Sequence, residues 1–170
     1  RGKEMCFAEV DIETEDRKPI AHVTAAVRAR FGAPAAELPK SAGDHGRAEP
    51  GTLGPQIGAI AFIGNRGIRV EHMTAGTSRL VMPWRDTNAD QDGNVHEGAV
   101  LALLDTAGAM ASWAETGPGR YKASTPAIQA QILAPAGQGE LVAYGRCVLR
   151  DRELLWSDVD VVRRADSAVC

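Results

Sequence analysis

The segment from residue 95 to residue 113 constrains the fold most strongly, because it reads as a helix whose residues are apolar on most sides. Such a helix must be enclosed by other elements of the chain. One acid, Asp105, lies in the middle of this run among apolar or small neighbours. Burial of an unpaired carboxylate is costly. Asp105 is therefore either satisfied by Thr106 or a nearby backbone group, or it is a general base or nucleophile.

Strand-like patterns surround this helix on both sides. They predict strands at residues 4–12, 19–30, 68–74, 78–83, 123–133, 141–149 and 153–162. Residues 56–64 predict a short amphipathic helix, while residues 86–94 and 116–120 read as loops. One central helix among many strands predicts an α+β fold.

An internal repeat indicates how the chain is organised into domains. Residues 1–12, RGKEMCFAEVDI, match residues 150–161, RDRELLWSDVDV, at an offset of 149 residues. The repeat predicts a two-strand segment at 1–32 that resembles the end of a domain. A linker rich in Pro, Gly and Ala is predicted at 33–55, followed by the main domain at 56–170.

The relation between the two repeated segments has three interpretations. The chain is a truncated tandem of two domains, or strand 19–30 supplies a closing strand to its own or a neighbouring sheet, or the match over twelve positions is a coincidence. An open sheet edge needs cover, and this need favours strand donation.

Composition and charge argue against several classes of function. The net charge of -3 is spread without long blocks of one sign, so neither nucleic acid nor an anionic membrane surface is expected as a partner. The longest apolar run is far shorter than the roughly 20 residues of a membrane span, and residues 1–6 show no signal-peptide pattern. The expected location is therefore cytoplasmic. The three cysteines and four histidines show no metal-ligand spacing, so no disulfide, metal or cofactor is expected.

His96 begins the central helix, directly after the turn Asp92-Gly93-Asn94. Free N–H groups and the helix dipole at that end favour negative charge, so an oxyanion can be held there; a solvated capping histidine is the alternative. Nine residues separate His96 from Asp105, which is about half a rotation and about 13 Å along the helix axis. One helix cannot bring both residues together. A shared site therefore predicts two antiparallel copies of this helix in a dimer.

Three motifs in this region resemble a known family. They are Gly93-Asn-Val-His96-Glu-Gly98, then Asp105-Thr-Ala-Gly, and a strand from Thr125 that ends in Pro135-Ala. With the His-to-Asp spacing, they resemble the hotdog-fold acyl-CoA thioesterases of the phenylacetate-pathway type over residues 56–169. Residues 1–30 resemble the closing two strands of the same family. The resemblance implies a curved antiparallel sheet wrapped around one long helix, in a homodimer or a dimer of dimers. It also implies hydrolysis of acyl-CoA to free acid and CoA.

The resemblance implies roles for the matching residues. Asp105 activates the hydrolytic water or attacks the thioester, and Thr125 assists from the adjoining strand. From the partner's helix, His96 and the amides of Glu97 and Gly98 polarise the thioester carbonyl. Asn88 helps to place the thioester, and Asn94 is its candidate substitute because the loop is longer than usual. Candidates for binding CoA, by position alone, are Arg146, Arg150 and Arg152. The alternative for these arginines is a solvated strand face.

Glu97 departs from the family pattern, which has Gly at this position. A bulky acid keeps the backbone amide but can crowd or repel a CoA phosphate. Two further functions stay open, the first because enzymes of the same fold also use a His and a helix carboxylate, and the second because of Glu97. One is an acyl-thioester hydratase or dehydratase, and the other is a non-catalytic module that binds an acyl group or another small ligand.

Overall fold

The computed structural model describes residues 5–28, 37–44, 46, 48–117 and 124–170. Predictions made for residues 1–4, 29–36, 118–120 and 123 lie outside this described part. The chain divides into two compact units, Arg1–Ala36 and Glu37–Cys170.

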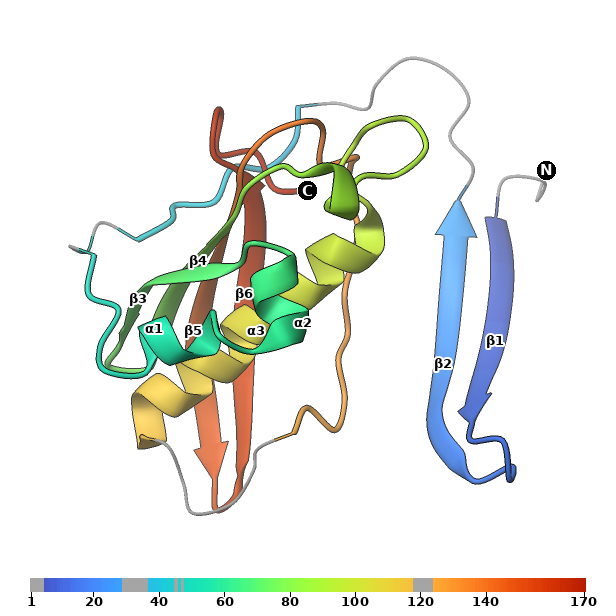
Figure 1. Cartoon of the computed structure of the whole chain (residues 1–170), viewed down its shortest axis with the longest axis horizontal. Helices are drawn as coiled ribbons and strands as arrows, with labels where there is room; N and C mark the ends of the chain where they lie inside the picture. Colours follow the sequence, from blue (N-terminus) through green and yellow to red (C-terminus); the bar gives the residue numbers. More distant parts are fainter. Residues whose placement is uncertain (1–4, 29–36, 45, 47, 118–123) are drawn as a thin grey trace. The chain divides into compact units, whose positions relative to one another are not determined.

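The first unit is a β-hairpin, coloured blue in Figure 1. Strand β1 (Met5–Glu13) pairs antiparallel with strand β2 (Pro19–Arg28), close to the predicted bounds. The Thr14 amide closes the turn by donating a hydrogen bond of 3.0 Å to the Lys18 carbonyl. All nine residues of β1 are exposed, so the hairpin by itself has no core.

The second unit contains an antiparallel sheet with the strand order β3-β4-β5-β6. Its strands are β3 (Arg69–Thr74), β4 (Thr77–Met82), β5 (Leu141–Asp151) and β6 (Leu154–Arg163), each within two residues of its predicted bounds. Helix α3 (Glu97–Thr116) lies across one face of this sheet (Figure 1). The predicted α+β architecture, a sheet wrapped around one long helix, is confirmed.

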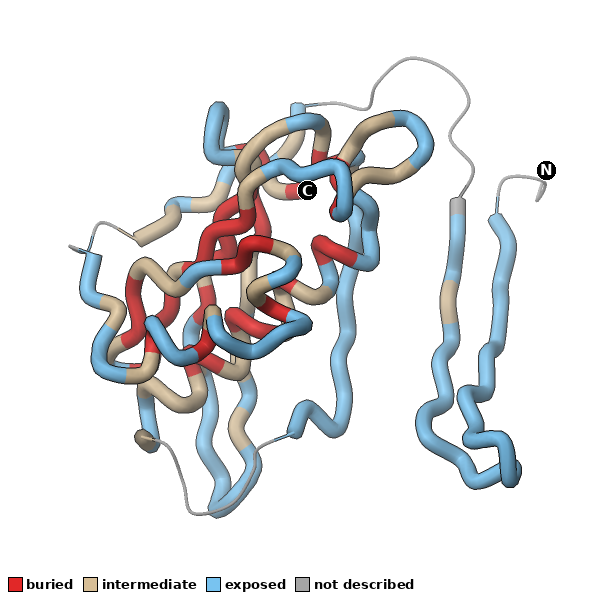
Figure 2. Tube along the Cα trace, viewed as in Figure 1, coloured by how far each residue is buried: buried red, intermediate tan, exposed pale blue. Residues whose placement is uncertain are grey.

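Small residues let α3 approach the sheet closely. The Ser78 hydroxyl on β4 donates a hydrogen bond of 2.7 Å to the Ala107 carbonyl, and a Cβ atom built on Gly145 would lie 2.8 Å from the same oxygen. Figure 2 shows that buried residues concentrate where α3 meets the strands. The main core cluster is formed by Ile57, Ile63, Ile68, Met73, Leu80, Met82, Val95, Ala99, Val100, Leu103, Ala107, Met110, Ala136, Leu141, Ala143, Val161 and Cys170.

The other face of the sheet is covered by a segment that the sequence suggested was a linker. The Val169 amide donates to the Pro39 carbonyl at 2.9 Å, and the Met73 amide donates to the Glu49 carbonyl at 2.9 Å. The apolar cluster Val81, Val142 and Val162 lies on this face. Residues 37–55 therefore belong to the second unit, whose boundary lies at Glu37 rather than at residue 56.

Two local predictions were wrong. Residues 124–133 do not form a strand, because their backbone finds no sheet partner in the described part of the chain; the Leu133 amide instead donates to the Cys170 carbonyl at 2.9 Å. Residues 56–64 do not form one helix but parts of two short ones, α1 (Gly54–Ile57) and α2 (Ala61–Asn65), separated at Gly58. Among the described residues, no helix combines the length and apolarity that a membrane crossing requires.

Candidate active site

Asp105 and Thr125 are brought together from different parts of the chain. Asp105 lies half-buried in the middle of α3, and Thr125 lies on the exposed extended segment that follows the helix. The Thr125 hydroxyl donates a hydrogen bond of 2.7 Å to Asp105 Oδ1. Such a bond to a carboxylate fixes the orientation of the group and leaves its second oxygen available. Thr106, the alternative partner from the sequence, donates to the Ala102 carbonyl instead.

His96 is the N-cap residue of α3. Its Nδ1 atom accepts a hydrogen bond of 2.9 Å from the Gly98 amide, and its own amide donates to the Asn88 carbonyl at 2.8 Å. Because Nδ1 is the acceptor, the proton of the neutral ring lies on Nε2, which can donate to a ligand. The Gly98 amide is engaged by this cap, whereas the Glu97 amide occupies the first helical position, where no intrahelical acceptor exists.

A cleft of about 390 Å³ lies beside this helix start, lined by Arg66, Thr87, Asn88, Ala89, His96, Gly98 and Ala99. Asn88 is 3% exposed, and its Nδ2 atom donates to the Arg66 carbonyl at 2.9 Å. The buried Oδ1 atom of Asn88 has no hydrogen-bond partner among the described residues. An unsatisfied buried acceptor is rare and costly in a folded protein.

The predicted substitute for Asn88 does not line this cleft. The Asn94 backbone closes the preceding loop: its amide donates to Asp90 Oδ1 at 2.9 Å, and its carbonyl accepts from the Asp90 amide at 2.8 Å. The loop length thus leaves Asn88 beside His96 and uses Asn94 for the turn.

The three predicted CoA-binding arginines lie away from the helix start. Arg146, Arg150 and Arg152 are exposed on β5 and its turn to β6. That end of the sheet adjoins the end of α3, since a Cβ atom on Gly76 would lie 2.9 Å from Glu115 and 3.7 Å from Cys147. Twenty helical residues span about 30 Å, so these arginines and His96 of one chain are near opposite ends of α3.

Sequence reasoning missed Arg66 as a cleft residue. Its guanidinium carbon lies 3.9 Å from the centroid of the Phe62 ring, and Nη1 donates to the Phe62 carbonyl at 3.0 Å. The sequence shows only a single basic residue after a short helix. Arg66 lies beside the same cleft as His96 because the Asn88 side chain, 22 residues further along the chain, donates a hydrogen bond to the Arg66 carbonyl.

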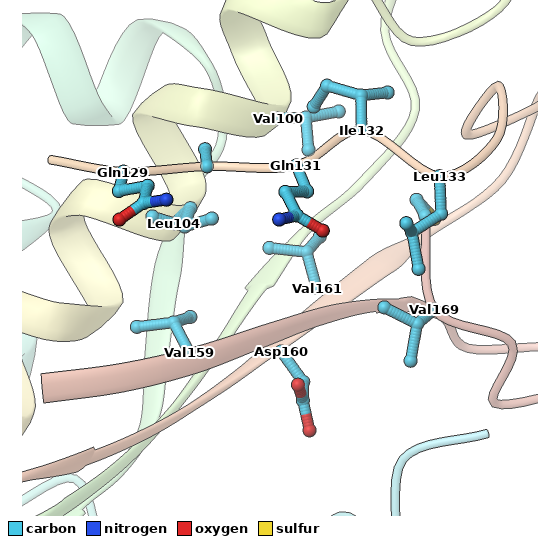
Figure 3. A pocket seen from close by; sticks show the side chains of 12 residues that line it. Val100, Leu104, Gln129, Gln131, Ile132, Leu133, Val159, Asp160, Val161 and Val169 are labelled. Atoms are coloured by element: carbon cyan, nitrogen blue, oxygen red, sulfur yellow. The ribbon is translucent and has the colours of Figure 1, made fainter. Parts of the chain in front are cut away.

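A second groove, with a volume of about 220 Å³, lies between α3, residues 129–133 and β6. Figure 3 shows Gln129 and Gln131 reaching into it, while Asp160 points away. Val169 and Cys170 also line it, and burial raises the pKa of the Cys170 thiol, which keeps that thiol protonated. Within the described ranges, no group of three His, Cys, Asp or Glu side chains is arranged to hold a metal ion.

Known proteins resemble this chain in sequence and in fold. The profile of the thioesterase superfamily matches residues 92–170, which begin just before α3. A protein of Halobacterium salinarum, named as a candidate esterase, is 30% identical over 115 residues, or 65% of this chain and 74% of that protein. A similarly named protein of Deinococcus radiodurans is 27% identical over 119 residues, or 70% of this chain and 69% of its own.

Solved structures show the same fold. A mutant of the phenylacetic acid degradation protein PaaI from Thermus thermophilus is 28% identical, with a TM-score of 0.56 over 64% of this chain and 90% of its own. A thioesterase from Haemophilus influenzae is 20% identical, with a TM-score of 0.60 over 68% of this chain and 80% of its own. The chain therefore belongs to the thioesterase superfamily, as a hotdog-fold protein of the PaaI-like type.

Proposed function

We propose that this protein hydrolyses acyl-CoA thioesters to the free acid and CoA, with Asp105 as the catalytic carboxylate. Membership of the thioesterase superfamily supports thioester hydrolysis. The observation that carries the assignment to Asp105 is its hydrogen bond of 2.7 Å from Thr125. A half-buried acid on an apolar helix, oriented by a threonine on a separate segment, has the arrangement of a positioned general base.

The reaction follows from the groups at hand. Asp105 takes a proton from water as the water oxygen attacks the thioester carbonyl carbon. The resulting tetrahedral oxyanion collapses, the C–S bond breaks, and the CoA thiolate takes up the proton that Asp105 holds. Thr125 holds Oδ1 of Asp105, so the other carboxylate oxygen is free to accept the proton. The acid and the thiol leave as separate products.

The oxyanion would be stabilised by the start of a second α3 helix. His96 and Asp105 of one chain are separated by about 13 Å along the axis. In a homodimer with antiparallel helices, the partner's His96 would lie near Asp105. Its Nε2–H and the Glu97 amide are donors at the positive end of the helix dipole, where developing negative charge is favoured. The Gly98 amide can join them only if it leaves His96 Nδ1.

The same cleft would hold the substrate beside the reacting carbonyl. Asn88 lines the cleft, and its unpaired Oδ1 atom would accept from a substrate N–H group if the side chain turned toward the cleft. The pantetheine arm of CoA carries two such amides. Arg66, which lines the cleft, is better placed for a CoA phosphate than Arg146, Arg150 or Arg152 of the same chain.

Thiol release from a panel of short, long and aryl acyl-CoAs tests the function. We expect Asp105→Asn to lower kcat by about 10²- to 10⁴-fold, the range for loss of a general base. Glu115→Gln, an exposed acid on the same helix, is the matched control and should keep full activity. A folded dimer that releases no thiol from any acyl-CoA would instead indicate a ligand-binding module, and addition of water without thiol release would indicate a hydratase.

A further inference from the structure

The β1–β2 hairpin has one entirely apolar face. Residues opposite each other in an antiparallel pair share a face of the sheet. The pairs Cys6–Val27, Ala8–Ala25, Val10–Val23 and Ile12–Ala21 are apolar on both sides. The opposite face carries Glu9 with Thr24, and Asp11 with His22, whose Nδ1 lies 2.7 Å from Asp11 Oδ1. An isolated two-stranded hairpin is at best marginally stable, so this apolar face requires a covering layer.

Strand β6 shows what covers such a face. The internal repeat aligns β1 with β6 residue by residue, so that Val10 corresponds to Val159 and Ile12 to Val161. Val161 is buried in the core under α3, and a Cβ atom on Gly108 of α3 would lie 3.5 Å from Val159. Acids match on the outer face as well, because Glu9 corresponds to Asp158 and Asp11 to Asp160. The apolar face of β1 thus has the pattern of a strand that packs on a central hotdog helix.

The register of the neighbouring strand also matches. Ile12 pairs with Ala21 in the hairpin, and their equivalents are Val161 and Cys170. The Cys170 amide donates to the Val161 carbonyl at 2.9 Å. Residues 168–170 therefore lie beside β6 in the same register in which the start of β2 lies beside β1. The groove lined by Val159, Val161 and Leu104 is the place that corresponds to the rest of β2 (Figure 3).

We propose that β1 and β2 are the closing hairpin of a first hotdog domain, whose central helix is encoded ahead of Arg1 in the same polypeptide. This helix is the occupant of the apolar hairpin face. The α3 helix of a second copy is not equivalent to it, because its own sheet already covers it. Donation of β2 to β6 in the register that β2 has beside β1 is blocked at its start, because Ala168 and Cys170 already hold the first positions beside β6.

The hairpin also specifies the chemistry of the helix that it fits. Val159 and Ser157 approach α3 at Gly108, with 3.5 and 3.7 Å from a Cβ atom built there. Their equivalents in the hairpin are Val10 and Ala8. The helix of the first domain should therefore carry a Gly or Ala at the position that faces these two residues, on an otherwise apolar side.

The coding sequence upstream of Arg1 gives the first test. We expect it to continue in frame through a domain with strands and one long apolar helix that carries Gly or Ala at the position equivalent to Gly108. A start codon immediately before Arg1, or an upstream domain of another architecture, overturns the proposal.

Cys6 on the apolar face gives the second test, by the rate of its alkylation. In the 170-residue chain Cys6 is exposed and should react fast. In the product of the whole gene, the rate should fall by at least about tenfold, as for a group protected by a folded domain. Val10→Asp should restore fast alkylation of the whole product, whereas Glu9→Gln, on the opposite face, should not.

Three results would contradict the proposed first domain. One is equally fast alkylation of Cys6 in the whole gene product. Another is protection of Cys6 in the 170-residue chain that rises with protein concentration, which would indicate a second copy as the cover. The third is protection in the 170-residue chain at every concentration, which would indicate a cover within that chain.

Discussion

Replacement of Thr125 by Val removes the hydroxyl that holds Asp105 and keeps the shape of the side chain. Thr125 is exposed, so water can replace its donor in the free protein, and we expect the free energy of unfolding to fall by less than about 1 kcal/mol. With substrate bound, water is excluded and the lost bond is one to a charged carboxylate, which contributes about 1.5–3 kcal/mol. Since 1.36 kcal/mol is a factor of ten in rate, kcat should fall by about 10- to 150-fold.

Thiol release at saturating acyl-CoA measures this effect, and Thr125→Ser, which keeps a hydroxyl, is the control that should retain most of the rate. A double-mutant cycle separates a role through Asp105 from a role elsewhere. In an Asp105→Asn background, Thr125→Val should cost little more, because its acceptor no longer carries the charge. An equal loss from Thr125→Val in both backgrounds, or no loss in the parent protein, would refute the reasoning.

Three further predictions address the cleft, the core and pH. Arg66→Ala should raise KM for acyl-CoA by about 5- to 30-fold but leave KM for the acyl-pantetheine thioester, which lacks the phosphates, unchanged; Arg146→Ala should change neither. Gly145→Ala should lower the free energy of unfolding by about 1–3 kcal/mol, because its Cβ atom would lie 2.5 Å from Ser78 Oγ. Gly139→Ala is the control that should cost less, since its Cβ atom would meet nothing within 4 Å. Urea titration compares the two variants. The hydrogen bond from Arg163 lowers the pKa of Asp166. The contribution of this bond to stability is therefore present above the ordinary aspartate pKa near 4, and it is lost as the pH falls through the lowered pKa. Asp166→Asn should therefore lower Tm at pH 6, and thermal melts should show the difference from the parent disappearing in acid.

The sequence predicted the elements that a periodic pattern of apolar residues identifies, which are the central helix and the strands around it. A helix that is apolar on most sides can exist only inside other layers, so α3 and the strands around it were identifiable from residue spacing. The link between Asp105 and Thr125 was implied by the family resemblance, and its geometry was found in the structure. The position of His96 as N-cap followed from the turn before the helix.

Features that depend on distant parts of the chain escaped this reasoning. Residues 124–133 have a strand pattern, but a strand forms only when another strand satisfies its backbone, and none does so within the described residues. Residues 37–55 lack periodicity and read as a linker, although their backbone bonds to β3 and to the segment after β6. Arg66 became a cleft residue only through its carbonyl contact with Asn88.

Glu97 shows why a departure from a family motif need not remove the chemistry of the site. The backbone amide at this first helical position is supplied by any residue except proline, so replacing Gly by Glu keeps the donor. The Glu97 side chain is exposed, and an acid in the first turn of a helix is stabilising by about 0.3–1 kcal/mol. The same charge opposes a second negative group at the helix start, including a CoA phosphate or an oxyanion. A cation beside the cleft offsets that repulsion, and Arg66 is the lining residue that carries one. Glu97 therefore makes the proposed site more dependent on Arg66 than a Gly at this position would.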